Sequence, residues 1–175
     1  MSRARVVVLL SAVLVMVLAA VPAGAQGGTA TARLRPFDEV PALSTGGGGH
    51  FSATISADGS EITYQLSYLN LSAAVLQSHL HFAQKGVNGG IMIFLCSNLG
   101  NGPAGTQTCP TGGGTISGTI HASDVIGGAF SQGVTPGDLN AVLRGLRIGV
   151  VYVNVHTTNF PGGEIRGQLQ FTPTP

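Results

Sequence analysis

The chain has little charge, few cysteines and no tryptophan. Only 9% of its 175 residues are charged, and it contains two cysteines. A disordered chain needs the opposite composition, with many charges and few apolar residues, so that class is excluded. Beyond Arg3 and Arg5 near the N-terminus, six basic and seven acidic residues remain, which leaves a net charge near −1. This balance predicts no basic patch, and nucleic acid is not expected as a partner.

The only long apolar run lies at the N-terminus. Arg3 and Arg5 precede the run 6–21, and the small residues Ala23-Gly24-Ala25 follow it. This order is typical of a secretory signal peptide. The alternative is a retained membrane anchor, but the run is short for a span of about 20 residues. We expect residues 1–25 to be removed after Ala25, with 26–175 secreted to the periplasm or the extracellular space as one domain without a membrane span.

Cys96 and Cys109 are predicted to form a disulfide, because a secreted chain meets an oxidising compartment. Closing the turn-rich loop between them stabilises by roughly 3 kcal/mol in the chain-entropy model. The alternative is a metal-binding or catalytic pair, but the spacing is not that of a CxxC motif.

Short apolar runs alternate with turn signals about every ten residues, which is typical of an antiparallel sandwich or barrel. One short helix is expected after Thr135, a candidate N-cap followed by Pro136, with Leu139, Val142, Leu143 and Leu146 on its apolar face. The predicted strands are 30–34, 49–56, 61–69, 75–82, 90–96, 115–121, 150–157 and 164–171.

Strand alternation predicts that three histidines lie on outward faces. Val151, Val153 and Val155 form a core face, so Asn154 and His156 point away from it. The same alternation turns His79 and His81 outward, together with Glu164 and Arg166 of the last strand.

Two histidines at i and i+2 project the same way with Cβ atoms about 6.5–7 Å apart. With His156 they supply three nitrogens, a set that suits copper or zinc. The alternative is a structural polar network. For Glu164 and Arg166 we expect a salt bridge or a link to Glu39 rather than catalysis. The side chain of Asn154 is expected to form hydrogen bonds with the backbone of a loop.

Several motifs together resemble the CHRD domain, the module repeated in chordin and found alone in secreted microbial proteins. They are Glu39-Val40-Pro41, 59–64, His79-Leu80-His81-Phe82 with 86–89, Leu143-Arg144-Gly145, 152–157 and 161–168. The resemblance covers 29–171. Phe82 stands where the family pattern usually has Gly, and the segment between the cysteines resembles an insertion.

The resemblance implies an extracellular Greek-key β-sandwich, immunoglobulin-like or superoxide-dismutase-like, of about eight strands and unknown biochemical function. Growth-factor binding is not implied, because in chordin it belongs to cysteine-rich repeats that this chain lacks. The order of elements is also similar to copper/zinc superoxide dismutase. That similarity implies His79, His81 and His156 as copper ligands and Arg166 as an anion guide. A bridging histidine and a zinc-site aspartate have no clear counterparts, and His50 and His121 are candidates only by elimination.

Two functions follow from these patterns. The first is a non-enzymatic extracellular module that binds a protein, glycan or surface through its loops. The second is a copper- or zinc-binding protein, with superoxide-dismutase-like chemistry as an extension. The sequence leaves the metal, the partner and the oligomeric state open.

Overall fold

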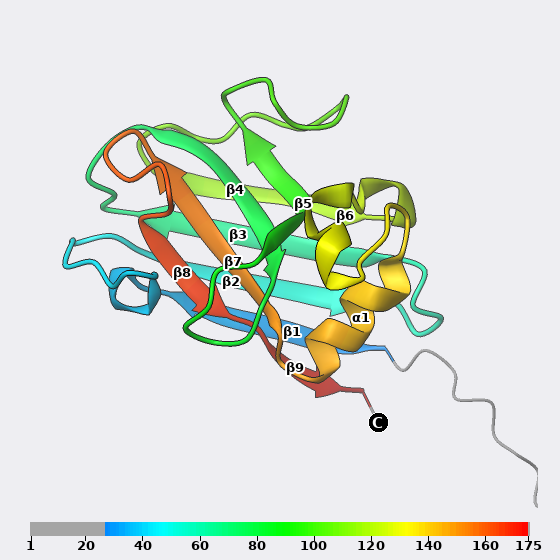
Figure 1. The fold of residues 1–175 in the computed structure, drawn as a ribbon. Coiled ribbons are helices and arrows are strands. Elements are labelled where there is room, and N and C mark those ends of the chain that lie inside the picture. The colour runs from blue at the N-terminus through cyan, green and yellow to red at the C-terminus, as the bar shows by residue number, and fades with distance from the viewer. Residues whose placement is uncertain (1–26, 175) are drawn as a thin grey trace, which may run out of the picture.

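The computed structural model of the chain describes residues 27–174, and the predicted signal peptide and its cleavage point lie outside them. The regular secondary structure of the described part is mostly β-strand (Figure 1). Its strands are β1 Gly28–Leu34, β2 Gly48–Ile55, β3 Ile62–Leu69, β4 Val75–Phe82, β5 Gly90–Ser97, β6 Gly114–Ile120, β7 Val151–Thr157, β8 Ile165–Gln168 and β9 Gln170–Pro173. Its helices are the short 3₁₀ helices η1 Pro36–Asp38, η2 Ala122–Asp124 and η3 Gly127–Gln132, and the α-helix α1 Leu139–Arg147.

The strands form two antiparallel sheets packed face to face. One sheet has the order β6-β3-β2-β1-β9 and the other the order β5-β4-β7-β8. β2 and β3 are joined by a tight turn in which Gly59 has φ +69°, a conformation that favours glycine. The predicted all-β antiparallel sandwich is confirmed.

The core lies between the sheets and follows the alternation of the strands. β1 buries Ala30, Ala32 and Leu34 and exposes the residues between them. Val151, Val153 and Val155 of β7 are fully buried on the core face, as the pattern predicted. Apolar burial of this kind contributes about 25 cal/mol per Å² and is the main force that holds the sheets together.

The last predicted strand, 164–171, is wrong as a single strand. It breaks at Leu169 into β8, which pairs with β7, and β9, which pairs with β1 of the other sheet. Leu169 remains buried where the chain crosses from one sheet to the other. Alternation could not reveal the crossing, because the inward residues keep the same period on both sides of it.

The helix begins later than predicted. Asp138, not Thr135, is the N-cap, and its carboxylate accepts from the Ala141 N–H at 2.8 Å. Gly137 has φ +83°, so the backbone at Pro136 cannot run straight into a helix. The four predicted apolar residues of α1 are buried, and the helix packs at one end of the sandwich beside β9 and β7 (Figure 1).

The predicted disulfide between Cys96 and Cys109 is formed, with the two Cα atoms 5.2 Å apart. It joins the end of β5 in one sheet to the segment that leads into β6 in the other. Within residues 27–174, none of the helices has the length and apolar character that crossing a bilayer requires.

Candidate metal centre

The predicted histidines lie on the outer face of the four-stranded sheet, and that face is largely covered. His79 is 0% exposed, and His81 and His156 are each 6% exposed. They lie off the inter-sheet core, as alternation predicted, but other segments cover them. All seven residues of β7 are buried, so both faces of that strand are covered.

Much of the cover is the segment 83–89, called here the cover loop, which joins β4 to β5. In Figure 1 it is the green loop that passes in front of β7 and β8. The Gly89 N–H donates to the Tyr152 hydroxyl at 3.3 Å. Arg166 donates to the Val87 carbonyl at 2.7 Å and to Asn88 Oδ1 at 3.1 Å. These bonds hold the loop against the sheet and keep water from the histidines.

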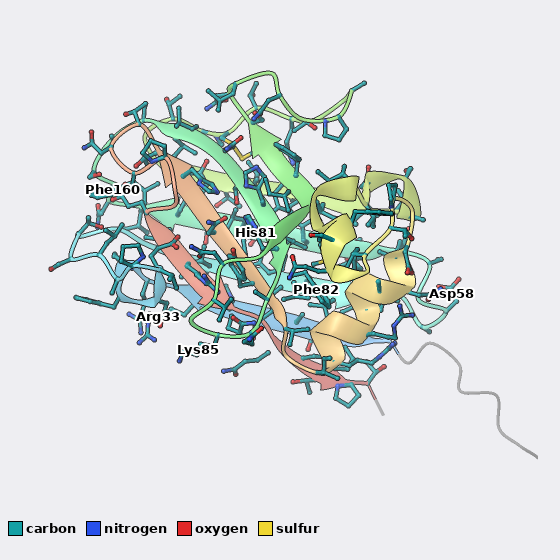
Figure 2. All side chains as sticks on the ribbon, viewed as in Figure 1. Arg33, Asp58, His81, Phe82, Lys85 and Phe160 are labelled. Carbon is teal, nitrogen blue, oxygen red and sulfur yellow. A yellow bond between two sulfur atoms is a disulfide. The ribbon has the colours of Figure 1, made fainter. Side chains whose placement is uncertain are left out.

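The structure brings the three predicted histidines together. One nitrogen from each of His79, His81 and His156 lies within 4.8 Å of the others. The register of β4 against β7 explains this, because His79 lies opposite Asn154 and Gln77 opposite His156. Figure 2 labels His81 near the centre of the molecule.

Two of the imidazoles are held in a defined tautomer by backbone carbonyls. His81 Nδ1 lies 2.9 Å from the Gly89 carbonyl oxygen, and His156 Nδ1 lies 2.8 Å from that of Pro161. A carbonyl oxygen only accepts, so both Nδ1 atoms carry the proton and both Nε2 atoms present a lone pair. His79 Nδ1 then donates to His156 Nε2 at 3.1 Å. An Nδ1–H bonded to a backbone carbonyl is the arrangement that commonly orients metal-ligating histidines.

The amide of Asn154 is directed into the same cluster. Its Oδ1 lies 3.0 Å from His156 Nε2, and its amide group hydrogen-bonds with the carboxyl group of Glu39. The Glu39 interaction orients the amide so that Oδ1 lies beside His156 Nε2, the acceptor of the His79 Nδ1–H bond. A cation bound at His156 Nε2 would replace the His79 Nδ1–H bond and could take Oδ1 as a further donor.

Burial keeps the imidazoles uncharged. It lowers the pKa of His79 to about 2 and that of His81 to about 4, and it lowers the pKa of His156 as well. The proximity of the rings acts in the same direction for His79 and His81. Neutral imidazole is the form that binds a metal, so little proton release opposes binding at neutral pH.

Glu39 is also buried, which raises its pKa to about 7 against the opposing influence of the Arg166 guanidinium. It approaches the cluster past Gly163, which has φ +127°. A methyl group on Gly163 would meet Glu39 Oε1 and Asn154 Nδ2, so only glycine leaves room for this contact.

Arg166 and Glu164 do not form the salt bridge that the sequence suggested as one alternative. The Glu164 carboxylate accepts from Ser72 N–H at 2.8 Å, Ser72 Oγ at 2.9 Å and Thr157 Oγ1 at 2.7 Å. The guanidinium of Arg166, whose pKa burial lowers, lies 3.5 Å from the centre of the Tyr152 ring. For the other alternative, a link to Glu39, the described residues show no ion pair with Arg166, whose charge only opposes the rise in the Glu39 pKa.

Tyr152 is one of two residues near the cluster that sequence reasoning missed. Its ring stacks on His81 with centroids 4.6 Å apart, so Arg166, Tyr152 and His81 form one stack. Its position two residues before Asn154 on the same face was the available signal. Asn88 was missed because it lies on a loop, where alternation gives no orientation. His50 and His121 are both exposed and do not belong to the cluster.

Most of the chain matches one known protein family. Residues 30–169 match the CHRD domain. The chain belongs to the CHRD domain family. The searches of curated proteins and of solved structures found no match. The CHRD assignment and the disulfide are compatible with an extracellular location, and the assignment itself names no ligand.

Proposed function

We propose that this CHRD domain is a secreted metal-binding module that holds one copper or zinc ion with His79, His81 and His156. One observation supports this most strongly. Three buried imidazoles converge, and backbone carbonyls turn the lone pairs of two of them toward the cluster. Asn154 Oδ1 is positioned as a candidate fourth donor.

A structural polar network explains the cluster less well. In such a network buried polar atoms have hydrogen-bond partners. Here His79 Nε2 and His81 Nε2 are buried, and among the described residues neither has a hydrogen bond within 3.5 Å, although the Asn154 side chain also interacts with the His81 ring. An unpaired buried polar group costs about 1–3 kcal/mol. An ion bound by these nitrogens would remove that penalty.

The charges around the site favour monovalent copper. The three imidazoles and the amide are neutral ligands, and Arg166 adds a positive charge nearby. Glu39, whose pKa is raised to about 7, carries only part of a negative charge at neutral pH. The cost of burying an ion rises steeply with its charge, so Cu(I) is buried more easily than Zn(II) or Cu(II). Imidazole nitrogen is a suitable donor for copper and for zinc, so titration with each ion can test this preference.

The test is a titration of the mature protein, purified without a tag, with Cu(I), Cu(II) and Zn(II) in separate experiments. We expect one ion per chain, bound most tightly as Cu(I). His79→Leu removes one ligand and fills its space with an apolar side chain. Among described hydrogen bonds of the His79 side chain, it breaks only the one to His156. The variant should keep its circular dichroism spectrum and lose the stoichiometric binding.

His50→Ala is the matched control, because His50 is an exposed histidine on β2 outside the cluster. It should bind the ion as the wild type does. Binding that weakens equally in both variants would assign the affinity to surface histidines and contradict the proposal. Failure of the wild type to bind any of the three ions would do the same.

A further inference from the structure

The fold gathers most of its positive charge around one groove. The groove has a volume of about 790 Å³ and lies beside β1, the start of the cover loop and the end of α1. Of the six basic residues in the described part of the chain, five line it: Arg33, Arg35, Lys85, Arg147 and Arg166. The even charge balance of the sequence predicted no basic patch, and it could not reveal that these cations gather at one place.

Negative charge in the groove is slight. Asp38 is its only acidic lining residue, and Arg35 binds that carboxylate at 2.8 and 3.0 Å. Arg33 and Lys85 are exposed, and among the described residues neither side chain has a hydrogen bond or an ion pair. Figure 2 shows both at the same edge of the molecule, one from β1 and one from the cover loop. Cations that converge from separate segments create a field that attracts anions.

The rest of the lining indicates a ligand larger than an inorganic ion. Thr31 and Gln170 are exposed polar side chains that can hydrogen-bond hydroxyl groups. Ile148, which is 71% exposed, adds an apolar surface beside them. A groove of this volume has the size of a small-molecule site.

From these features we infer that the groove binds an acidic saccharide, in which carboxylate groups pair with Arg33 and Lys85 and sugar hydroxyls bind the neutral side chains. A nucleic acid fits less well. It carries one charge per about 1.7 Å of duplex, whereas the described chain has seven acidic residues against six basic ones. A polyphosphate that extended beyond the groove would therefore meet a surface with net negative charge.

The experiment measures binding of alginate oligomers, a carboxylated saccharide, at low ionic strength, with neutral dextran and single-stranded DNA as the comparison probes. We expect alginate to bind, dextran not to bind, and DNA to bind more weakly than alginate. Affinity for alginate should fall as salt rises, because exposed charges are screened. Replacing both Arg33 and Lys85 by alanine should weaken binding by at least about tenfold, which corresponds to about 1.4 kcal/mol.

Arg144→Ala provides the control for net charge. Arg144 is the one basic residue of the described part that does not line the groove, and it pairs with Asp138 at 3.5 Å. Its removal should change alginate affinity less than about twofold. A loss similar to that of the double variant would assign binding to overall charge and overturn the inference. DNA that binds as tightly as alginate, or alginate that does not bind, would overturn it as well.

The metal proposal and the groove are tested separately. His79→Leu removes a proposed metal ligand that does not line the groove, so it should leave alginate binding unchanged. Joint loss of both activities in this variant would show that the groove depends on the cluster, contrary to the assignment.

Discussion

The outer faces of the two sheets differ sharply although both are rich in polar residues. The five-stranded sheet exposes Thr29, Thr31, Thr63, Gln65 and Thr119. The four-stranded sheet buries its histidines together with Asn154, Glu164 and Arg166. Polar groups on the first face bind water, while those on the second must find partners in the protein. The second face is therefore where a change of one side chain should have large and specific effects.

The largest effect is expected from Arg166→Met. Arg166 is 2% exposed and donates hydrogen bonds to Val87 and Asn88. Its positive charge is also the strongest influence that lowers the pKa of Glu39. Its loss frees the cover loop and leaves buried acceptors unpaired, so we expect a loss of about 3 kcal/mol in the free energy of unfolding. Urea unfolding measures this.

Arg33→Met is the matched substitution on the exposed face, where it should change stability by less than about 0.5 kcal/mol. Equal effects of the two substitutions would show that burial of the second face carries no energetic weight.

Metal binding at the buried face should raise the free energy of unfolding, and it should do so only while the three histidines are intact. At a free metal concentration of 100 times Kd, binding adds about 2.7 kcal/mol to the unfolding free energy. We expect Cu(I) to raise the melting temperature of the wild type and not that of His79→Leu. A rise of the same size in His79→Leu would indicate binding elsewhere.

Gly163→Ala should cost about 2 kcal/mol. The backbone at Gly163 has φ +127°, and a methyl group there would meet Glu39 Oε1 and Asn154 Nδ2. Gly162→Ala, next to it in the same turn, meets no other heavy atom within 4 Å and should be nearly neutral. Thermal unfolding of the two variants separates backbone flexibility of the turn from the contact with the buried cluster.

The smallest effect is expected from Thr119→Val on the exposed face of β6. Thr119 has no side-chain hydrogen bond to another described residue, and valine suits a strand equally well. Stability measured by urea unfolding should change by less than about 0.5 kcal/mol. A loss above 1 kcal/mol would mean that this face, too, depends on specific contacts.

Much of the fold could be predicted because it follows from local periodicity. The bounds of β4 were predicted without error, and most other strands within one or two residues. The same reasoning failed at Leu169, where the chain changes sheets, and at Thr135, where Gly137 delays the helix. Both failures concern the path of the backbone between elements, and the spacing of apolar residues carries no information about that path.

For the candidate site, the sequence determined which side chains share a face, because a strand has a period of two. His79 with His81, and Asn154 with His156, followed from spacing alone. Only the tertiary structure decided that these two pairs adjoin, through the register of β4 against β7, and that the cover loop buries them. The groove has the same origin, because its cations are far apart in the chain and converge only when β1, the cover loop and α1 pack at one edge. Side-chain chemistry is local to each residue, whereas convergence and exclusion of water depend on contacts between distant segments.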